Sequence, residues 1–180
     1  MKISSKITTD RLFLCDVSDE DCNELYSLIN KNRLFLNYWL AWVNNIQNLE
    51  DEKIAINKMK YDWKVGKKFC YTIRLNSIIK KTIIGMISII RVNEARTECE
   101  IGYWLGEEFT SKGYISEALQ GLEKKLKELN FKETYIKCYN DNAKSISVAQ
   151  RNGYKQYDCI KYGIANKEAN SIILFKKVLV

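Results

Sequence analysis

The chain has 180 residues, of which 46% are hydrophobic and 28% charged, with a formal net charge of +7 and no histidine. This length suits one substantial core, and no apolar run reaches the roughly 18 residues that span a bilayer, so we expect a single cytoplasmic domain over residues 1–180. The missing histidine excludes Ser-His-Asp and Cys-His nucleophilic sites and removes the commonest metal ligand.

The charge and the cysteines limit the partners further. A net positive charge favours anions: a cofactor with phosphates, an acidic protein or nucleic acid. The lysines are scattered and no nucleic-acid-binding motif is present, so we expect neither direct nucleic-acid binding nor membrane binding. The six cysteines show no metal-ligand spacing, which predicts reduced, structural residues and no metal site.

The N-terminal half begins with a strand over residues 6–15. Ser18 and Asp21 form a capping pattern before a helix that ends near residue 30, with a face made of Cys22, Leu25, Tyr26 and Ile29. Asn48 is placed to cap a further helix reaching about residue 65. Its inward-facing residues are predicted to be Ile54, Met59 and Trp63.

Two strands follow at residues 69–75 and 82–91, joined by a turn near Asn76 and Ser77, and consecutive antiparallel pairing is the simplest arrangement. After the stretch from residue 98 to residue 117, we expect a strand at 134–139, a helix at 143–152 closed by Gly153, and strands at 154–162 and 171–178. This order predicts an α+β sheet with one parallel junction.

The stretch from residue 98 to residue 117 reads as a strand, a tight loop and the start of a helix. Strand residues 98–105 alternate between two unlike faces. Beyond the loop, apolar residues recur at helical spacing, namely Ile115, Ala118, Leu119, Leu122, Leu126 and Leu129. A helix start presents free backbone N–H groups to which phosphate can bind, although Gly113 easing an ordinary turn explains these residues equally well.

Several motifs in order are similar to those of the GNAT acetyltransferase superfamily, and most similar to its RimJ/RimL-like branch of ribosomal-protein N-terminal acetyltransferases. They are Thr-Asp-Arg-Leu at 9–12, Glu-Ile-Gly-Tyr-Trp-Leu at 100–105, Lys-Gly-Tyr-Ile-Ser-Glu-Ala-Leu at 112–119, Asn-Ala-Lys-Ser at 142–145 and Gln-Arg-Asn-Gly-Tyr at 150–154. The resemblance implies an α+β fold with a mixed, mostly antiparallel sheet that is splayed at its centre and flanked by helices.

The resemblance also implies a site for acetyl-CoA. In this family the loop holds the pyrophosphate and the splayed strand receives the pantetheine arm. Carried over to this chain, the pyrophosphate role falls on Ser111, Lys112, Gly113, Tyr114 and Ile115, and the pantetheine role on the backbone of Tyr103, Trp104 and Leu105. The family loop usually begins with Gln or Arg, has a second Gly and closes with Gly or Ala, where this chain has Thr110, Ser111 and Ile115.

Attack of an amine on a thioester needs a proton acceptor, and Glu100 is the candidate base because it lies on the non-core face of strand 98–105. Alternatively, the carboxylate is solvated or paired with Arg96 or with a lysine on a neighbouring strand. We weigh this alternative equally with the catalytic role for Glu100 and favour it for Glu98. An α-amine with a pKa of about 7.7 to 8.0 needs only modest help from a base.

Asn142 and Ser145 form an Asn-x-x-Ser pattern at a helix start, where both residue types are routine caps. The resemblance implies that Ser145 hydrogen-bonds the departing thiolate as general acid and that Asn142 contacts the pantetheine arm. A thiol with a pKa of about 8.5 needs little protonation, so a hydroxyl suffices. Tyr139 and Tyr154 are the alternative donors.

Residues 33–42 are rich in large apolar side chains and resemble the segment that walls the acceptor cleft in this family. We therefore assign Tyr38, Trp39 and Trp42 to acceptor binding. The alternative is that Leu34, Tyr38 and Trp42, which lie at helical spacing, belong mostly to the core.

The predicted function is transfer of an acetyl group from acetyl-CoA to a primary amine, with the N-terminal amine of a ribosomal protein as the favoured acceptor. One alternative acceptor is a polyamine or aminoglycoside, which would require an acidic cleft lined by the Glu107-Glu108 or Asp51-Glu52 pair. Another alternative is a non-catalytic acetyl-CoA-binding module, which the changed loop residues would favour. The family often forms dimers, which leaves a homodimer as one option for the oligomeric state.

Overall fold

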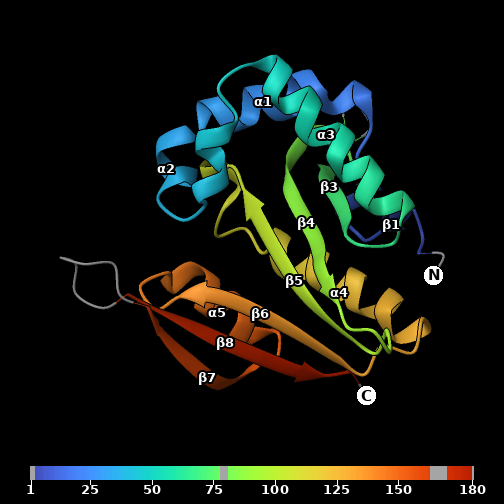
Figure 1. Cartoon of the computed structure of the whole chain (residues 1–180), viewed down its shortest axis with the longest axis vertical. Helices are drawn as coiled ribbons and strands as arrows, with labels where there is room; N and C mark the ends of the chain where they lie inside the picture. Colours follow the sequence, from blue (N-terminus) through green and yellow to red (C-terminus); the bar gives the residue numbers. More distant parts are fainter. Residues whose placement is uncertain (1–2, 78–80, 163–169, 180) are drawn as a thin grey trace.

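The structure is a computed structural model that describes residues 3–77, 81–162 and 170–179, and its centre is an eight-stranded sheet (Figure 1). Strands β1 to β5 pair in sequence order and antiparallel, β5 pairs β6 in parallel, and β8 then lies between β6 and β7. The strands in spatial order are β1 (Lys6–Thr8), β2 (Leu12–Asp16), β3 (Phe69–Leu75), β4 (Ile83–Val92), β5 (Glu98–Leu105), β6 (Glu133–Tyr139), β8 (Asn170–Val178) and β7 (Lys155–Tyr162). The predicted α+β sheet with one parallel junction is confirmed.

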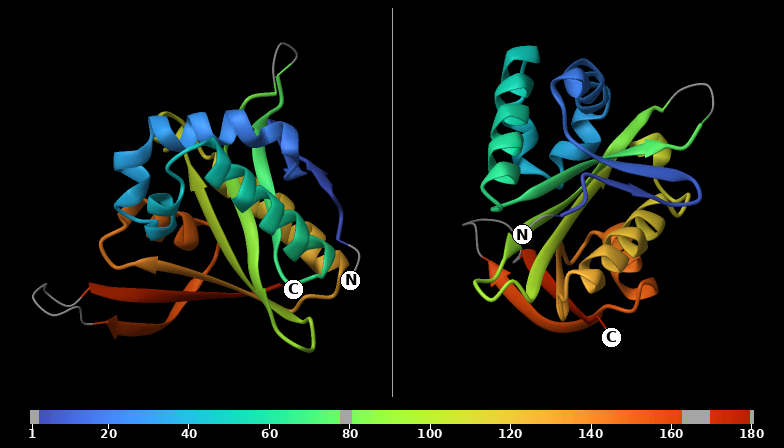
Figure 2. Two further views of the ribbon diagram at one scale, coloured as in Figure 1. Left: turned by 45° about the horizontal axis from the view of Figure 1, so that its top comes forward. Right: turned by 90° about the vertical axis from the view of Figure 1, so that its right-hand side faces the viewer.

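Helices cover both faces of this sheet (Figure 2). The α-helices are α1 (Cys22–Lys31), α2 (Arg33–Asn37), α3 (Leu49–Lys64), α4 (Tyr114–Glu128) and α5 (Ala143–Arg151). Alternate residues of β3 explain the layers, because Cys70 packs with α1 whereas Tyr71 and Ile73 pack with α4. No helix in the described part of the chain is long and apolar enough to cross a membrane.

The single strand predicted over residues 6–15 is wrong, because the chain forms a hairpin there. The Thr9 N–H donates to the Leu12 carbonyl at 2.9 Å, and the Thr9 hydroxyl accepts from the Leu12 N–H at 3.1 Å. This tight turn reverses the chain between β1 and β2, which pair in the register Ile7 to Leu14. Both strands are too short for their apolar pattern to reveal the break.

The two predicted helix starts are confirmed. The Ser18 N–H donates to the Asp21 carboxylate at 3.0 Å before a 3₁₀ turn (Asp19–Asp21) that leads into α1. The Asn48 side chain accepts from the N–H groups of Glu50 and Asp51 at 2.9 and 3.0 Å, which caps α3. Local hydrogen bonding of short polar side chains is therefore read correctly from sequence at both places.

The inward face of α3 differs from the prediction at Ile54, which is 62% exposed. The buried residues are Ile56 and, unexpectedly, Glu52, with Met59 and Trp63 partly buried. Positions 52, 56, 59 and 63 follow the helical repeat, whereas position 54 lies well off that face. The face was misassigned because an acidic residue occupies one of its core positions.

Burial of Glu52 predicts a pH-dependent stability. Desolvation raises the pKa of Glu52 to about 7 from 4.5, so the folded chain holds a proton that the unfolded chain releases above pH 4.5. Stability that is present below pH 4.5 is therefore lost as the pH rises towards about 7, at about 1.4 kcal/mol for each unit of pKa, or about 3 kcal/mol in all. Urea unfolding at pH 5 and pH 8 should show this loss in the wild type and a smaller one in Glu52→Gln. Glu50→Gln, at an exposed position of the same helix, should keep the wild-type loss. An unchanged pH dependence in Glu52→Gln would contradict the assignment.

Beyond the first parallel pairs, β5 and β6 separate. Their ladder covers only Glu98 to Glu133, Cys99 to Thr134 and Glu100 to Tyr135. From Ile101 onward β5 remains paired with β4 but has no ladder partner on its β6 side among the described residues. The predicted splay at the sheet centre is thus confirmed, and Figure 1 shows the two strands diverging towards α2 and α5.

The six cysteines are free, as predicted. Four of them are buried and pack as small core residues, namely Cys22, Cys70, Cys99 and Cys138. Burial also raises the pKa of each of these thiols, so they stay protonated and unreactive. Of the predicted turn after β3, Asn76 and Ser77 lie in the described part of the chain, and residues 78–80 lie outside it.

Candidate active site

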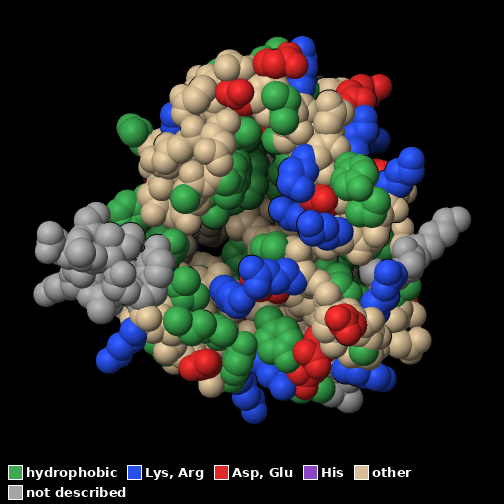
Figure 3. Space-filling model, in the orientation of Figure 1, with side chains coloured by type: hydrophobic (Ala, Val, Ile, Leu, Met, Phe, Trp, Pro, Cys, Tyr) green, Lys and Arg blue, Asp and Glu red, His purple; other side chains and the backbone are tan. Residues whose placement is uncertain are grey.

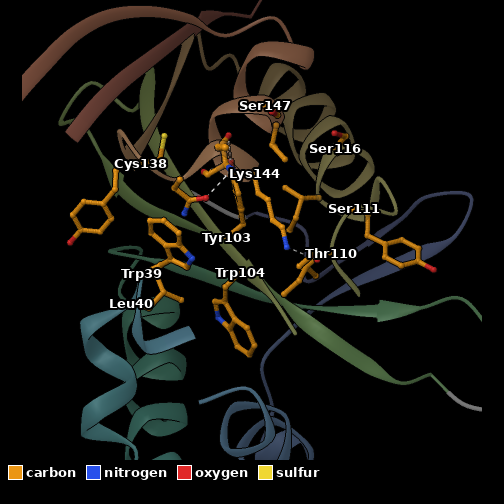
Figure 4. Close-up of a pocket in the computed structure, with 18 of the residues that line it drawn as sticks. Trp39, Leu40, Tyr103, Trp104, Thr110, Ser111, Ser116, Cys138, Lys144 and Ser147 are labelled. Atoms are coloured by element: carbon orange, nitrogen blue, oxygen red, sulfur yellow. Dashed lines mark hydrogen bonds between the residues drawn. The ribbon is translucent and has the colours of Figure 1, made fainter. Parts of the chain in front are cut away.

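A cavity of about 530 Å³ opens where β5 and β6 diverge. Its walls come from α2, from the loop between β5 and α4, from the first turn of α4, and from β6 and α5 (Figure 4). Figure 3 shows the molecular surface hollowed between the part that carries α1 to α3 and the arm formed by β6 to β8. The splay therefore creates a cleft that reaches both faces of the sheet.

Most of the residues predicted from sequence line this cavity. They are Trp39, Tyr103, Trp104, Leu105, Ser111, Gly113, Tyr114, Ile115, Asn142 and Ser145. Four others, Tyr38, Trp42, Glu100 and Lys112, are not among its described lining residues. The cavity thus brings together the loop, the splayed strand and the start of α5, which are separated by up to 42 residues in the sequence.

The loop before α4 has the backbone shape of an anion site. Ser111 and Gly113 adopt left-handed conformations with φ of 60° and 80°, and the helix starts at Tyr114. Alternation of left-handed with ordinary residues points successive N–H groups into a concavity, and the helix dipole adds positive potential there. Backbone amides do not depend on the side chain at position 111, and Ser111 adopts the left-handed conformation without being a glycine.

A brace from the N-terminal hairpin holds this loop. The Glu117 carboxylate accepts from the Thr9 hydroxyl at 2.6 Å and from the backbone and side chain of Arg11 at 2.7 and 2.6 Å. Burial raises the pKa of Glu117, but these donors outweigh it and lower that pKa overall. Arg11 also donates to the Lys112 carbonyl at 3.1 Å and lies over the Tyr114 ring. Sequence reasoning missed this brace, because it predicted one strand over residues 6–15 and used the Thr-Asp-Arg-Leu motif only for the family resemblance.

Ser145 lies at the start of α5 with its hydroxyl 3.0 Å from the Tyr103 hydroxyl. The Asn142 side chain accepts from the Ser145 N–H at 3.0 Å, so the predicted helix cap is present. Burial raises the pKa of Tyr103 far above its ordinary value, which keeps its hydroxyl protonated. The Tyr103 hydroxyl has two acceptors within reach, the Ser145 hydroxyl and the Ser145 carbonyl at 3.3 Å. When it donates to the Ser145 hydroxyl, the Ser145 proton is left for a group in the cavity.

The two alternative tyrosines occupy different places. Tyr139 lines the cavity, and its ring centroid is 6.3 Å from that of Trp39. Tyr154 is only 3% exposed and its hydroxyl lies 2.8 Å from the Thr134 hydroxyl, away from the cavity lining. Of Tyr103, Tyr139 and Tyr154, only Tyr103 has a hydrogen bond to Ser145 among the described residues. From the sequence, only the backbone of Tyr103 is assigned to the site.

Glu100 forms an ion pair with Lys137 of the neighbouring strand β6, with 2.9 Å between Oε2 and Nζ. This is the pairing that the sequence left open as the alternative to a catalytic base. Glu100 lies at the last paired position before the strands separate, and Lys137 lines the cavity. Glu98 accepts from the Tyr135 hydroxyl at 3.3 Å, which agrees with the structural role favoured for it.

The segment from residue 33 to residue 45 walls one end of the cavity. Trp39 and Phe35 face inward, as Figure 4 shows for Trp39. Leu34 and Tyr38 are 93% and 69% exposed, so the alternative that placed these two residues in the core is wrong. The short α2 buries Leu36, and Leu34 and Tyr38 lie two positions away on either side, well off that face, before a 3₁₀ helix (Ala41–Asn45) follows.

The other two predicted acceptor residues lie near the rim of the cavity. The Tyr38 hydroxyl donates to the Asp141 carboxylate at 3.4 Å, which links α2 to the loop before α5. Trp42 is 37% exposed and its ring centroid is 5.9 Å from that of Trp104, a cavity residue. Both side chains therefore lie beside the cleft, and of the three predicted acceptor residues only Trp39 lines the described cavity.

The charge of the cavity is positive. Lys137, Lys144 and Arg151 line it, and none of its described lining residues is Asp or Glu. Glu108 pairs with Lys31, and Glu52 is buried on the inward face of α3. The acidic cleft required by a polyamine or aminoglycoside acceptor is thus not formed by these residues. The three cations were missed, because nothing local distinguishes them among 29 lysines and arginines.

Comparison with known proteins agrees with this architecture. The model of the acetyltransferase (GNAT) domain matches residues 11–155. The ribosomal-protein-serine acetyltransferase of Escherichia coli strain K12 is 31% identical over 176 residues, which cover 95% of this chain and 94% of that protein.

Solved structures share the fold over almost the whole chain. RimL, a ribosomal L7/L12 alpha-N-protein acetyltransferase in complex with coenzyme A, matches with a TM-score of 0.87 at 23% identity, covering 96% of this chain and 97% of that one. The microcin C7 self-immunity acetyltransferase MccE, in complex with acetyl-CoA and AMP, matches with a TM-score of 0.86 at 28% identity, covering 94% and 93%. The splayed sheet, the loop before α4 and the match over residues 11–155 lead to one conclusion: the chain belongs to the GNAT acetyltransferase family.

Proposed function

We propose that the protein transfers the acetyl group of acetyl-CoA to the N-terminal amine of a ribosomal protein. The observation that carries this proposal is the cleft between β5 and β6, which joins an anion-binding loop to a hydroxyl donor and an aromatic wall. The acceptor class rests on the similarity to the Escherichia coli ribosomal-protein-serine acetyltransferase. A ribosomal acceptor would place the enzyme in the cytoplasm, and the homodimer and the single domain stay predictions.

The residues present suit acetyl-CoA. The loop amides at residues 111–115 and the cavity cations suit its phosphates. Among the residues that the structure describes, the β5 edge from Tyr103 to Leu105 has no ladder partner on the β6 side, so its backbone groups are available to an amide-bearing arm. Acetyl-CoA supplies the activated acetyl group, and the protein supplies orientation, a proton acceptor and a hydrogen-bond donor.

We assign the general-acid role to Ser145. Its hydroxyl reaches the cavity, and Tyr103 holds the oxygen in place. A thiol with a pKa of about 8.5 leaves as the thiolate almost as readily as it leaves in protonated form. One hydrogen bond from Ser145 to the departing sulfur is therefore sufficient. Asn142 fixes the first turn of α5 and so sets the direction of the Ser145 side chain.

We assign the base role to Glu100, acting through water. Its carboxylate lies beside the opening of the strands and is held by Lys137, whose side chain lines the cavity. An ion-paired carboxylate is a weak base, but an α-amine with a pKa of about 7.7 to 8.0 is already partly neutral near pH 7. Glu100 therefore only has to take up the proton from the fraction of the amine that is still charged.

Replacement of Glu100 by Gln should lower kcat about tenfold at pH 7, and the deficit should shrink at pH 9 because the amine is then neutral without help. Glu98→Gln, on the same face of β5 but bonded to Tyr135, serves as the matched control and should stay near the wild-type rate. Thiol release with a saturating acceptor peptide measures both rates. Equal rates for Glu100→Gln and the wild type at pH 7 would remove Glu100 from the mechanism.

The acceptor itself is tested with three amines. A peptide with the free N-terminal serine of a ribosomal protein should stimulate CoA release, and mass spectrometry should locate the acetyl group on its α-amine. The same peptide with a blocked N-terminus, and a polyamine, should give only the background rate. Stimulation by the polyamine alone would replace this proposal by small-amine acetylation, and no stimulation by any amine would favour a non-catalytic module.

A further inference from the structure

Lys144 crosses the cleft. It belongs to the first turn of α5, yet its Nζ donates to the Thr110 hydroxyl at 3.2 Å, in the loop before α4 (Figure 4). Its ammonium also lies 5.3 Å from the Phe35 ring centroid on α2. One side chain thus joins three walls of the cavity at the edge of the anion-binding loop.

The charge of Lys144 has only neutral partners among the described residues. The other two cations of the cavity are engaged differently, because Lys137 pairs with Glu100 and Arg151 donates its Nε to the Ser147 carbonyl one helical turn away. Beside the loop, the Arg11 charge is already paired with Glu117. Lys144 is therefore the cavity cation that reaches the loop with its charge uncompensated.

An ammonium has three donors, and the hydrogen bond to Thr110 uses one of them. An anion bound on the loop amides next to Thr110 would offer oxygens to the other two. The exposed position of the side chain keeps the cost of moving it small, since no buried partner has to be given up.

We propose that Lys144 is a phosphate-binding residue that supplies the countercharge for the pyrophosphate of acetyl-CoA, an inference that rests on the proposed function. The loop itself offers amides and hydroxyls, from Thr110, Ser111 and Gly113, but no cationic side chain that lines the cavity. Lys112 lies over the Phe109 ring at 5.8 Å. The cation at the loop therefore comes from α5, across the cleft.

The test is calorimetric binding of two ligands, acetyl-CoA and S-acetylpantetheine, which carries the same thioester arm without phosphates. Lys144→Gln should weaken acetyl-CoA about tenfold, as expected for a charge-assisted hydrogen bond, and should leave S-acetylpantetheine unchanged. Lys144→Arg should keep most of the affinity. The Lys53→Gln variant makes the same change of charge at an exposed position of α3 and should bind both ligands like the wild type.

Four outcomes would overturn the inference. Equal acetyl-CoA affinity for Lys144→Gln and the wild type would show that the ammonium does not contact the phosphates. Equal weakening of both ligands would show that Lys144 shapes the wall of the cleft, and a change confined to the KM of the acceptor peptide would assign it to the acceptor. Absence of acetyl-CoA binding by the wild type would instead overturn the proposed function along with this inference.

Discussion

Substitution of Gly113 by Asp should abolish binding of acetyl-CoA, raising its Kd at least a hundredfold. The glycine holds φ at 80°, a conformation that costs a side-chain-bearing residue about 1 to 2 kcal/mol. A new Cβ would also meet the Arg11 guanidinium at 3.4 Å. The larger effect is electrostatic, because a carboxylate at the start of α4 would repel phosphate from the N–H groups that should hold it.

Two control variants separate charge from strain in this experiment. Gly113→Ala carries the strain without the charge and should lose only part of the affinity. Gly153→Ala places the same strain, at φ 81°, after α5, where the nearest atom to the new Cβ is 3.9 Å away. It should lower the unfolding temperature and leave acetyl-CoA binding intact. Calorimetry with thermal unfolding measures both effects, and wild-type affinity in Gly113→Asp would place the phosphates elsewhere.

Ser145→Ala should lower kcat about 10- to 100-fold and leave the KM for acetyl-CoA close to the wild-type value. The hydroxyl is expected to act on the departing sulfur, where charge develops only during the reaction, so its loss removes transition-state stabilisation and spares ground-state binding. The fall should lie at the low end for acid catalysis because a thiolate is a good leaving group.

Tyr103→Phe tests whether the Ser145 hydroxyl is held by its neighbour. The single variant should lose less activity than Ser145→Ala, and the double variant should be no slower than Ser145→Ala alone, because Tyr103 acts through Ser145. Thiol-release kinetics of the four proteins complete the cycle. Additive losses would show that Tyr103 acts on its own, and a wild-type rate in Ser145→Ala would return the donor role to Tyr139.

Local patterns in the sequence account for most of the elements. Alternation along β5 predicted which side chains enter the core, since Cys99, Ile101 and Leu105 are buried. Helical spacing predicted the buried face of α4 in the same way. Its predicted residues are buried at Ile115, Ala118, Leu119, Leu122 and Leu126. These patterns succeed because the side-chain direction repeats with a fixed period in each element, whatever lies opposite.

Prediction failed where a local pattern had more than one tertiary outcome. Residues 6–15 have the composition of one strand, but a turn at Thr9 divides them. Leu34 and Tyr38 have the spacing of a buried helix face, but α2 buries Leu36 and leaves both of them exposed. On α3, a buried Glu52 occupies a position that composition assigns to the surface. Each error concerns which neighbours the segment meets.

The order of the elements, the positive charge, the exclusion of histidine chemistry and the loop before a helix start all follow from the residues themselves. Which polar groups meet in the cleft depends on how the elements pack. Arg11 and Glu117 are 106 residues apart, Tyr103 and Ser145 are 42 apart, and Lys144 reaches a loop 34 residues away. Such pairs depend on how far β5 and β6 diverge and on where α5 packs. A side chain at one position carries no local signal of its distant partner, so these contacts are set by the fold as a whole.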